Sequence, residues 1–215
     1  QARRAHDLDP ALAPATVLLA RRVAAEGRVR RARKIVEAAW IVGPHPSLVP
    51  VYLDIVDAKT SLARYTAVRN LVEDAAGHVE SRVALAEAAI GAELWGEARR
   101  QLDAIDDADI SSRVFRLRAR ITEGDEADSS AIEEWRNRAA VAQPDPAWVC
   151  GACGTVSDEW MGVCGNCGTL AGVVWAPPRR MHRAALGGGT GKIAAAGESV
   201  SPTIVAHADT APATP

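Results

Sequence analysis

All four cysteines of this 215-residue chain lie between residues 148 and 175, in two matched CGxCG motifs. Two residues separate the cysteines within each motif, and ten residues separate the two cysteine pairs. Each C-x-x-C turn directs two thiolates toward one point, and two such turns complete the tetrahedral ligand set of structural metal sites. The predicted ligands are Cys150, Cys153, Cys164 and Cys167. The spacing predicts a small four-cysteine β module of the zinc-ribbon or rubredoxin-like kind over residues 147–178.

Glycines and tryptophans around the cysteines support this interpretation. Gly154 and Gly168 directly follow the second cysteine of each motif, where a positive φ lets backbone N–H groups point at sulfur. Trp148, Trp160 and Trp175 are expected to cover a module that is too short for a core of its own. A structural zinc site contributes roughly 10–16 kcal/mol to folding at neutral pH, which is enough to order so short a segment. We expect zinc, and iron of the rubredoxin kind would use the same four ligands.

Three other uses of the cysteines fit the sequence less well. Two disulfides require an oxidising compartment, and no signal peptide is visible. A thioredoxin-like redox pair uses one C-x-x-C at a helix start within a βαβ unit, whereas this chain has two pairs without that setting. A nucleic-acid-binding ribbon requires basic residues, but the segment 148–175 has no Lys or Arg and the net charge of the chain is −2. We therefore expect no nucleic-acid partner.

The sequence also argues against catalysis. Four protein thiolates leave no open coordination position on a metal, so the site is expected to be structural or a docking platform. The five histidines are scattered over predicted loops and helix ends, and we interpret them as surface residues. No Ser/His/Asp set and no pair of carboxylates has a spacing that supports a catalytic role. The chain is therefore expected not to be an enzyme.

Residues 1–146 are rich in alanine and show the pattern of the tetratricopeptide repeat, which has about 34 residues. In the copy over 13–46, small residues recur where two helices would touch, a glycine stands at the turn and a proline closes the second helix. These positions are Ala20, Gly27, Ala32, Ala39 and Pro44. A second clear copy covers about 79–112, and degenerate copies cover about 47–78 and 112–146, the last with an expected serine N-cap. The pattern predicts four helical hairpins in a tetratricopeptide-like solenoid, with a generic helical bundle as the alternative.

The predicted solenoid has a concave side, built by the first helix of each hairpin, where we expect a protein partner to bind. Helix-face geometry alone selects the candidate contacts, which are Val17, Arg21, Ala24, Val83, Glu87 and Ile90. After residue 178 the composition shifts to Ala, Gly, Thr and Pro without an apolar period, which predicts a disordered tail. The expected domains are thus the repeats over 1–146, the cysteine module over 147–178 and the tail over 179–215.

Three stretches carry a resemblance to a known family: RRARKIVEAAW followed closely by PHP, ESRVALAEAAIGAELWGEARRQL, and PDPAWVCGACG. Residues 1–178 resemble the C-terminal half of HemY-type proteins of alphaproteobacteria, which are inner-membrane tetratricopeptide proteins named for an association with haem biosynthesis. The resemblance implies a preceding part with membrane helices, a repeat domain that faces the cytoplasm and no catalytic residues. The first residue is Gln, so we expect a piece of a longer protein. Its most apolar early run, ALAPATVLLA, is shorter than the roughly 20 residues that span a membrane.

The layout is also similar to that of LapB-type lipopolysaccharide assembly proteins, whose tetratricopeptide repeats end in a rubredoxin-like four-cysteine module. In that family the module packs against the repeats, and the protein is an adaptor to a membrane protease. The two resemblances together imply a non-catalytic scaffold or adaptor with a structural zinc or iron centre. An adaptor that links lipopolysaccharide synthesis to a membrane protease is the alternative to a haem-associated scaffold.

Overall fold

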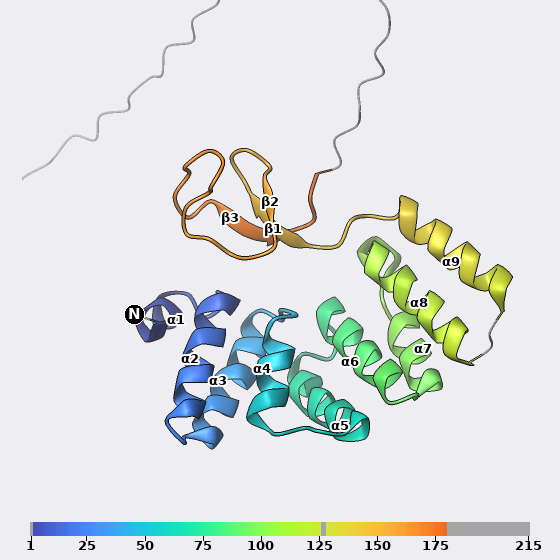
Figure 1. Ribbon diagram of the computed structural model, residues 1–215, viewed down its shortest axis with the longest axis horizontal. Coiled ribbons are helices and arrows are strands. Elements are labelled where there is room, and N and C mark those ends of the chain that lie inside the picture. The colour runs from blue at the N-terminus through green and yellow to red at the C-terminus, as the bar shows by residue number, and fades with distance from the viewer. Residues whose placement is uncertain (1, 126–127, 180–215) are drawn as a thin grey trace, which may run out of the picture. The chain divides into compact units, whose positions relative to one another are not determined.

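The computed structural model describes residues 2–125 and 128–179. Nine α-helices and one three-stranded sheet lie within these ranges and belong to one compact unit (Figure 1). The α-helices are α1 (Ala2–Leu8), α2 (Ala13–Ala25), α3 (Val29–Val42), α4 (Leu48–Ile55), α5 (Ser61–Val72), α6 (Val79–Gly91), α7 (Trp95–Asp103), α8 (Ser112–Asp125) and α9 (Ser129–Val141). The strands are β1 (Ala147–Cys150), β2 (Val156–Ser157) and β3 (Val173–Ala176). Apart from Arg179, the tail that the sequence predicts to be disordered lies outside the described residues.

Consecutive helices pack against one another along the chain. The pairs α2 and α3, α4 and α5, α6 and α7, and α8 and α9 are all in contact, and α5 with α6 and α7 with α8 join successive pairs (Figure 1). Each segment in which the sequence predicts a helical hairpin therefore contains two helices. The expectation that the part before residue 147 is mainly helical is confirmed. That its hairpins are tetratricopeptide repeats stays a prediction.

Buried alanines lie where the helices of the first hairpin pack together. Ala20 in α2 and Ala32 in α3 are completely buried, and Ala39 is 2% exposed. A methyl side chain at these positions lets the two helix backbones approach closely. Gly27 turns the chain between α2 and α3 with a φ of +78°, a conformation that glycine adopts without strain. The small-residue positions that the sequence singles out in this hairpin are thus the packing positions.

Larger apolar side chains fill two core clusters around these contacts. The first spans α2 to α6 and contains the fully buried Trp40 and Leu48. Within it, the Trp40 indole N–H donates to the buried Ser81 hydroxyl over 2.9 Å. The second cluster joins α6, α7 and α8 and contains Leu102 and Val114, both completely buried. Helices that are distant in sequence are therefore held in one continuous set of contacts.

The cap of α9 differs from the expectation of a serine. Asp128 is the N-cap, and its Oδ1 accepts from the backbone N–H groups of Ser130 at 2.9 Å and Ala131 at 3.3 Å. The Ser130 hydroxyl also donates to Asp128 Oδ1 and lowers the pKa of the Asp128 carboxyl most strongly. The two backbone hydrogen bonds lower this pKa further. The serine interpretation was wrong because the carboxylate precedes both serines and reaches the free N–H groups of the first turn.

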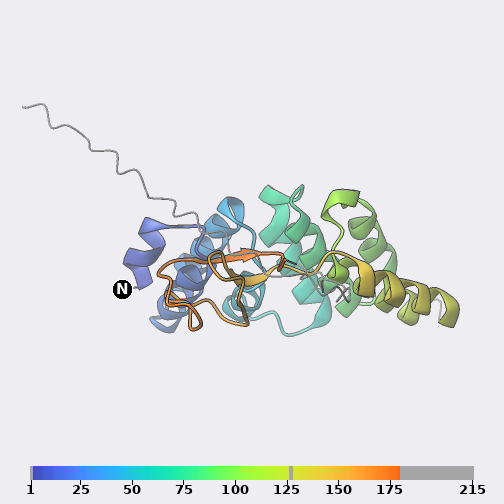
Figure 2. The same cartoon turned by 90° about the horizontal axis from the view of Figure 1, so that it is seen from above.

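The sheet has the strand order β2-β1-β3, with both pairings antiparallel. Trp148 in β1 lies opposite Ser157 in β2 and Trp175 in β3. Both views show the sheet beside the N-terminal helices and away from α9, the helix that directly precedes it (Figures 1 and 2). The chain therefore leads back along the helices before it forms the cysteine module.

Candidate metal centre

The four cysteine sulfurs converge at one end of the sheet. Cys150 ends β1, Cys153 lies in the turn toward β2, and Cys164 and Cys167 lie in a second turn before β3. The Sγ atoms of Cys150 and Cys167 are 3.7 Å apart, as are those of Cys153 and Cys164. All four Sγ atoms lie within 4.8 Å of one another. No disulfide joins them, since that bond would need a separation of about 2 Å.

These distances match a tetrahedral metal site. Zinc–thiolate bonds of about 2.3 Å give a tetrahedron with sulfur–sulfur edges of about 3.8 Å. Two of the six sulfur–sulfur edges are 3.7 Å and agree with that value, and the others do not exceed 4.8 Å. The donor set of four thiolates is one that zinc and iron both take. The arrangement can therefore hold a metal ion with four protein ligands.

The two cysteine turns have the same backbone hydrogen bonds. In the first turn Gly154 N donates to Cys150 O over 2.8 Å, and in the second Gly168 N donates to Cys164 O over 2.9 Å. The φ angles of the two glycines are +74° and +71°. In each turn the N–H of the first cysteine also donates, over 2.9 Å, to the threonine that follows the motif. The matched CGxCG motifs thus fold into matched loops, and the predicted left-handed glycines are confirmed.

Polar neighbours stabilise the exposed thiolates. The Thr155 hydroxyl, 3.1 Å from the Cys153 Sγ, together with the Thr155 N–H and the Asn166 amide, lowers the pKa of Cys153 to about 5. The equivalent hydroxyl and N–H of Thr169 lower the pKa of Cys167. For Cys150, backbone N–H groups act to lower the pKa, but burial and the neighbouring thiols outweigh them and raise it to about 11. A bound cation would favour the thiolate form at all four positions.

One side of the cysteine cluster is covered and the other is open. Cys150 and Cys164 are 1% and 3% exposed, whereas Cys153 and Cys167 are exposed. Trp148 belongs to the buried cluster around the covered pair, and Trp160 and Trp175 pack against it. The expected cover by three tryptophans is therefore present, and it lies on the side of Cys150 and Cys164.

His45 joins the helices to this module. It lies in the loop between α3 and α4, is 7% exposed, and its ring centroid is 5.2 Å from that of Trp148 and 4.4 Å from that of Trp175. Its Nδ1 accepts from the Ser47 backbone N–H over 3.1 Å, which places the ring proton on Nε2. The buried Nε2 has no hydrogen-bond partner among the described residues. Burial lowers the pKa of His45 to about 4, so the ring is neutral at physiological pH.

The interpretation of every histidine as a surface residue was wrong for His45. Packing against two tryptophans more than 100 positions away removes the ring from water. The sequence offers one indication, because the residue stands between Pro44 and Pro46 in a rigid PHP loop. His6 and His78 form hydrogen bonds with residues that are closer to them in sequence. The remaining two histidines lie outside the described residues.

The six predicted groove residues occupy different environments. Val17 and Ala24 are half-buried against core clusters, and Arg21 is exposed. Glu87 lines a cavity of about 240 Å³ between α4, α5 and α6. The other two, Val83 and Ile90, are 3% and 5% exposed within the cluster of α6, α7 and α8. These two are core residues, and neither has a free surface for a partner.

Glu87 also belongs to an ion-pair cluster that the sequence did not indicate. Arg113 in α8 binds both Glu87 carboxylate oxygens, through Nε at 2.9 Å and Nη2 at 2.8 Å, and its Nη1 lies 2.9 Å from Glu80. Burial raises the pKa of Glu80, although the Arg113 charge opposes that effect. The Arg113 backbone N–H donates to Asp145 just before β1. This cluster ties α6, α8 and the segment that leads into the cysteine module.

Comparison with known proteins finds a similarity to a magnetosome protein. No protein-family profile and no solved structure matches the chain. The chain is 30% identical over 190 residues to the "Probable magnetosome protein Mms48" of Magnetospirillum gryphiswaldense. The match covers 86% of this chain and 41% of that protein, so the chain spans less than half the length of this relative. Within the described ranges, every helix is too short or too polar to cross a membrane.

Proposed function

We propose that this chain is the helical-repeat part of a non-catalytic scaffold or adaptor, closed by a structural zinc centre. The observation that carries the proposal is the tetrahedral spacing of four cysteine sulfurs. A metal bound there has all four positions filled by protein, so it has no place for a water or a substrate. The metal is therefore assigned to holding the module together.

The size of the module supports a structural role for the metal. One of its three strands has only two residues, and a sheet this small is not stable by itself in water. Its apolar cluster contains four buried residues, of which two are the cysteines Cys150 and Cys164. Metal binding of roughly 10–16 kcal/mol supplies what the core lacks. With the sheet ordered, Trp148 and Trp175 are in place to cover His45.

The helical part is proposed to bind a protein partner as tetratricopeptide-like repeats. Successive helix pairs and the cavity beside Glu87 support this role. The resemblance to HemY-type proteins directs attention to haem-pathway enzymes at the cytoplasmic face of the inner membrane. The similarity to the probable magnetosome protein Mms48 makes the magnetosome a second setting for the same scaffold role. A LapB-type adaptor between lipopolysaccharide synthesis and a membrane protease is the alternative.

The metal assignment is tested on purified protein by elemental analysis and absorption spectroscopy. We expect about one zinc per chain and a colourless protein, since four thiolates complete one site. A ferric thiolate absorption band with matching iron content would replace zinc by iron. Cys150→Ser should abolish stoichiometric metal binding, whereas Val174→Ser, on an exposed position of β3, should retain it. Metal binding that survives Cys150→Ser would refute the four-cysteine site.

The scaffold role is tested by purifying the full-length protein from membranes and identifying what co-purifies. Three proteins are compared: the unchanged chain, the Cys150→Ser/Cys153→Ser variant and the Val174→Ser control. Haem enzymes retained by the control and lost with the cysteine variant support the haem-associated scaffold. A membrane protease with lipopolysaccharide enzymes supports the adaptor alternative. Identical partner sets from all three proteins would reduce the module to a stabilising end of the fold.

A further inference from the structure

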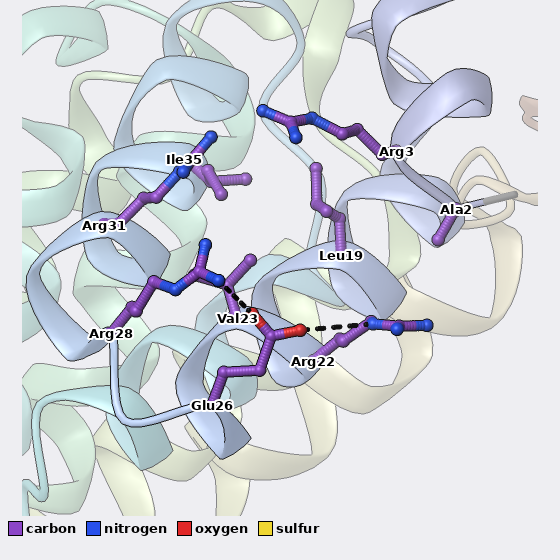
Figure 3. Close-up of a pocket in the computed structure, with 9 residues that line it drawn as sticks. All are labelled: Ala2, Arg3, Leu19, Arg22, Val23, Glu26, Arg28, Arg31 and Ile35. Atoms are coloured by element: carbon purple, nitrogen blue, oxygen red, sulfur yellow. Dashed lines mark hydrogen bonds and ion pairs between the residues drawn. The ribbon is translucent and has the colours of Figure 1, made fainter.

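A cavity of about 340 Å³ lies between α1, α2 and α3, and its chemistry is not explained by the scaffold role (Figure 3). Four arginines line it: Arg3 from α1, Arg22 from α2, Arg28 from the turn before α3, and Arg31 from α3. None of the predicted groove residues and none of the four cysteines lines it. It is therefore a second candidate site, separate from both features that carry the proposed function.

The charges in this cavity are not balanced. Its one acidic side chain, Glu26, pairs with Arg22 at 3.3 Å and with Arg28 at 3.0 Å. Within the described part of the chain, Arg3 and Arg31 have no carboxylate at ion-pair distance. Figure 3 shows these two side chains extending toward the same side of the cavity from different helices. Guanidinium groups that share a partly enclosed space repel one another, and an anion between them removes that repulsion.

The floor of the cavity is apolar. Leu19 and Val23 are 8% and 6% exposed, and the half-buried Ile35 completes the floor. A single phosphate or sulfate would leave this surface and most of the volume unused. Five of the nine lining residues are charged and four are apolar, so a ligand that fills the cavity meets both kinds of surface. The matching ligand carries more than one carboxylate and an aliphatic group between them.

We propose that this cavity binds an acidic peptide segment of a partner protein. Carboxylates of the segment pair with Arg3 and Arg31, where the planar guanidinium favours two parallel hydrogen bonds to each carboxylate. An aliphatic side chain of the same segment packs on Leu19 and Ile35. Glu26 holds the other two arginines in place through its ion pairs. The partner chemistry is thus defined as an acidic sequence with an interspersed leucine or isoleucine.

The experiment measures fluorescence anisotropy of a labelled Glu-Leu-Glu-Glu-Leu-Glu peptide with the metal-loaded chain. The matched probe is Gln-Leu-Gln-Gln-Leu-Gln, which keeps the aliphatic groups and removes the charges. The cavity variant is Arg3→Gln/Arg31→Gln. Its control is Arg4→Gln/Arg30→Gln, which removes two exposed arginines next in sequence that do not line the cavity. Circular dichroism checks that both variants keep the helical content of the unchanged chain.

We expect the acidic peptide to bind about tenfold more weakly to the cavity variant, because this variant removes the two guanidinium groups that would bind the carboxylates. The control should bind the peptide within about twofold of the original affinity. The glutamine peptide should bind at least about tenfold more weakly than the acidic one. Equal losses in the two variants would show a general basic surface and overturn the proposal. The proposal would also be overturned if sodium phosphate displaced the peptide more than sodium chloride of equal ionic strength does, because the site would then recognise a simple anion. Failure of this test leaves metal content and co-purification unaffected, so it is distinguishable from failure of the proposed scaffold.

Discussion

The buried His45 predicts that the protein loses stability in mild acid. Its pKa is lowered to about 4 in the folded chain by burial, whereas an exposed histidine in the unfolded chain has a pKa of about 6.5. Above pH 6.5 both states are neutral and the group has no effect. As the pH falls below 6.5, His45 binds a proton in the unfolded chain but not in the folded chain. The free energy of unfolding therefore decreases until about pH 4.

The expected size of the effect follows from these two pKa values. At pH 5.5 protonation lowers the free energy of the unfolded chain by about 1.4 kcal/mol, and at pH 7.5 by less than about 0.1 kcal/mol. The folded chain, with a His45 pKa of about 4, hardly binds the proton in this range. We therefore expect His45 to account for a loss of about 1 kcal/mol between pH 7.5 and pH 5.5.

The assay is urea unfolding, followed by helical circular dichroism, of the unchanged chain and the His45→Phe variant. Phenylalanine retains the ring that packs on Trp148 and Trp175 but cannot take up a proton. It also loses the acceptor for the Ser47 N–H, which shifts its stability by an amount independent of pH. Metal content is measured at each pH, and only conditions in which both proteins keep the metal are compared.

The informative quantity is the free energy of unfolding of the unchanged chain minus that of the His45→Phe variant, measured as a function of pH. This difference should fall by about 1 kcal/mol from pH 7.5 to pH 5.5, because only the unchanged chain contains the titrating ring. Carboxylates and the other histidines contribute equally to both proteins and cancel. A difference that stays constant over this range would show that the His45 ring is hydrated in the folded protein, and the contact between the helices and the module would have to be abandoned.

Three further predictions concern other parts of the chain. Arg113→Met should lower the free energy of unfolding in urea by about 3 kcal/mol, because it leaves the Glu80 carboxylate, whose side chain is only 12% exposed, without its partner. A loss below about 1 kcal/mol would contradict the described ion pairs. Gly168→Ala should lower the free energy of unfolding by about 1–2 kcal/mol in the same assay, since the φ angle of Gly168 is +71°. The Gly165→Ala control should be nearly neutral, because its added methyl group meets nothing closer than 3.9 Å. Trp40→Phe should lower the thermal midpoint through a loss of about 1–3 kcal/mol, because a buried serine hydroxyl loses its donor; an unchanged midpoint would count against that hydrogen bond.

The features that sequence analysis predicted correctly depend on residues that are close in the chain. Each CGxCG motif determines its own turn, because the glycine and the backbone N–H groups that complete it are immediate neighbours. Ala32 is buried because the helix period brings it to the face that meets α2. Such arrangements repeat wherever the same local pattern occurs, so spacing alone indicates them.

The contacts that sequence analysis missed depend on tertiary packing. Nothing near His45 in sequence shows that Trp148 will cover it, and the Arg113 to Glu80 pair spans 33 positions. The groove assignment of Val83 and Ile90 assumed that one face of α6 stays open. In the structure α6 contacts α5, α7 and α8, so faces that look free in a single hairpin are covered. Helix periodicity identifies an apolar face without identifying how many neighbours that helix has.

The contact between His45 and the sheet has a consequence for how the chain is made. About 100 residues separate His45 from Trp148, and a ribosome that adds about 5–20 residues per second needs about 5–20 s to synthesise them. During that interval the PHP loop is exposed to solvent, because the tryptophans that cover it are not yet synthesised. The helices before and after the loop can already fold. The nascent chain therefore exposes an apolar surface until the cysteine module emerges. Under the proposed structural role of the metal, a shortage of metal in the cell would prolong that exposure after synthesis ends.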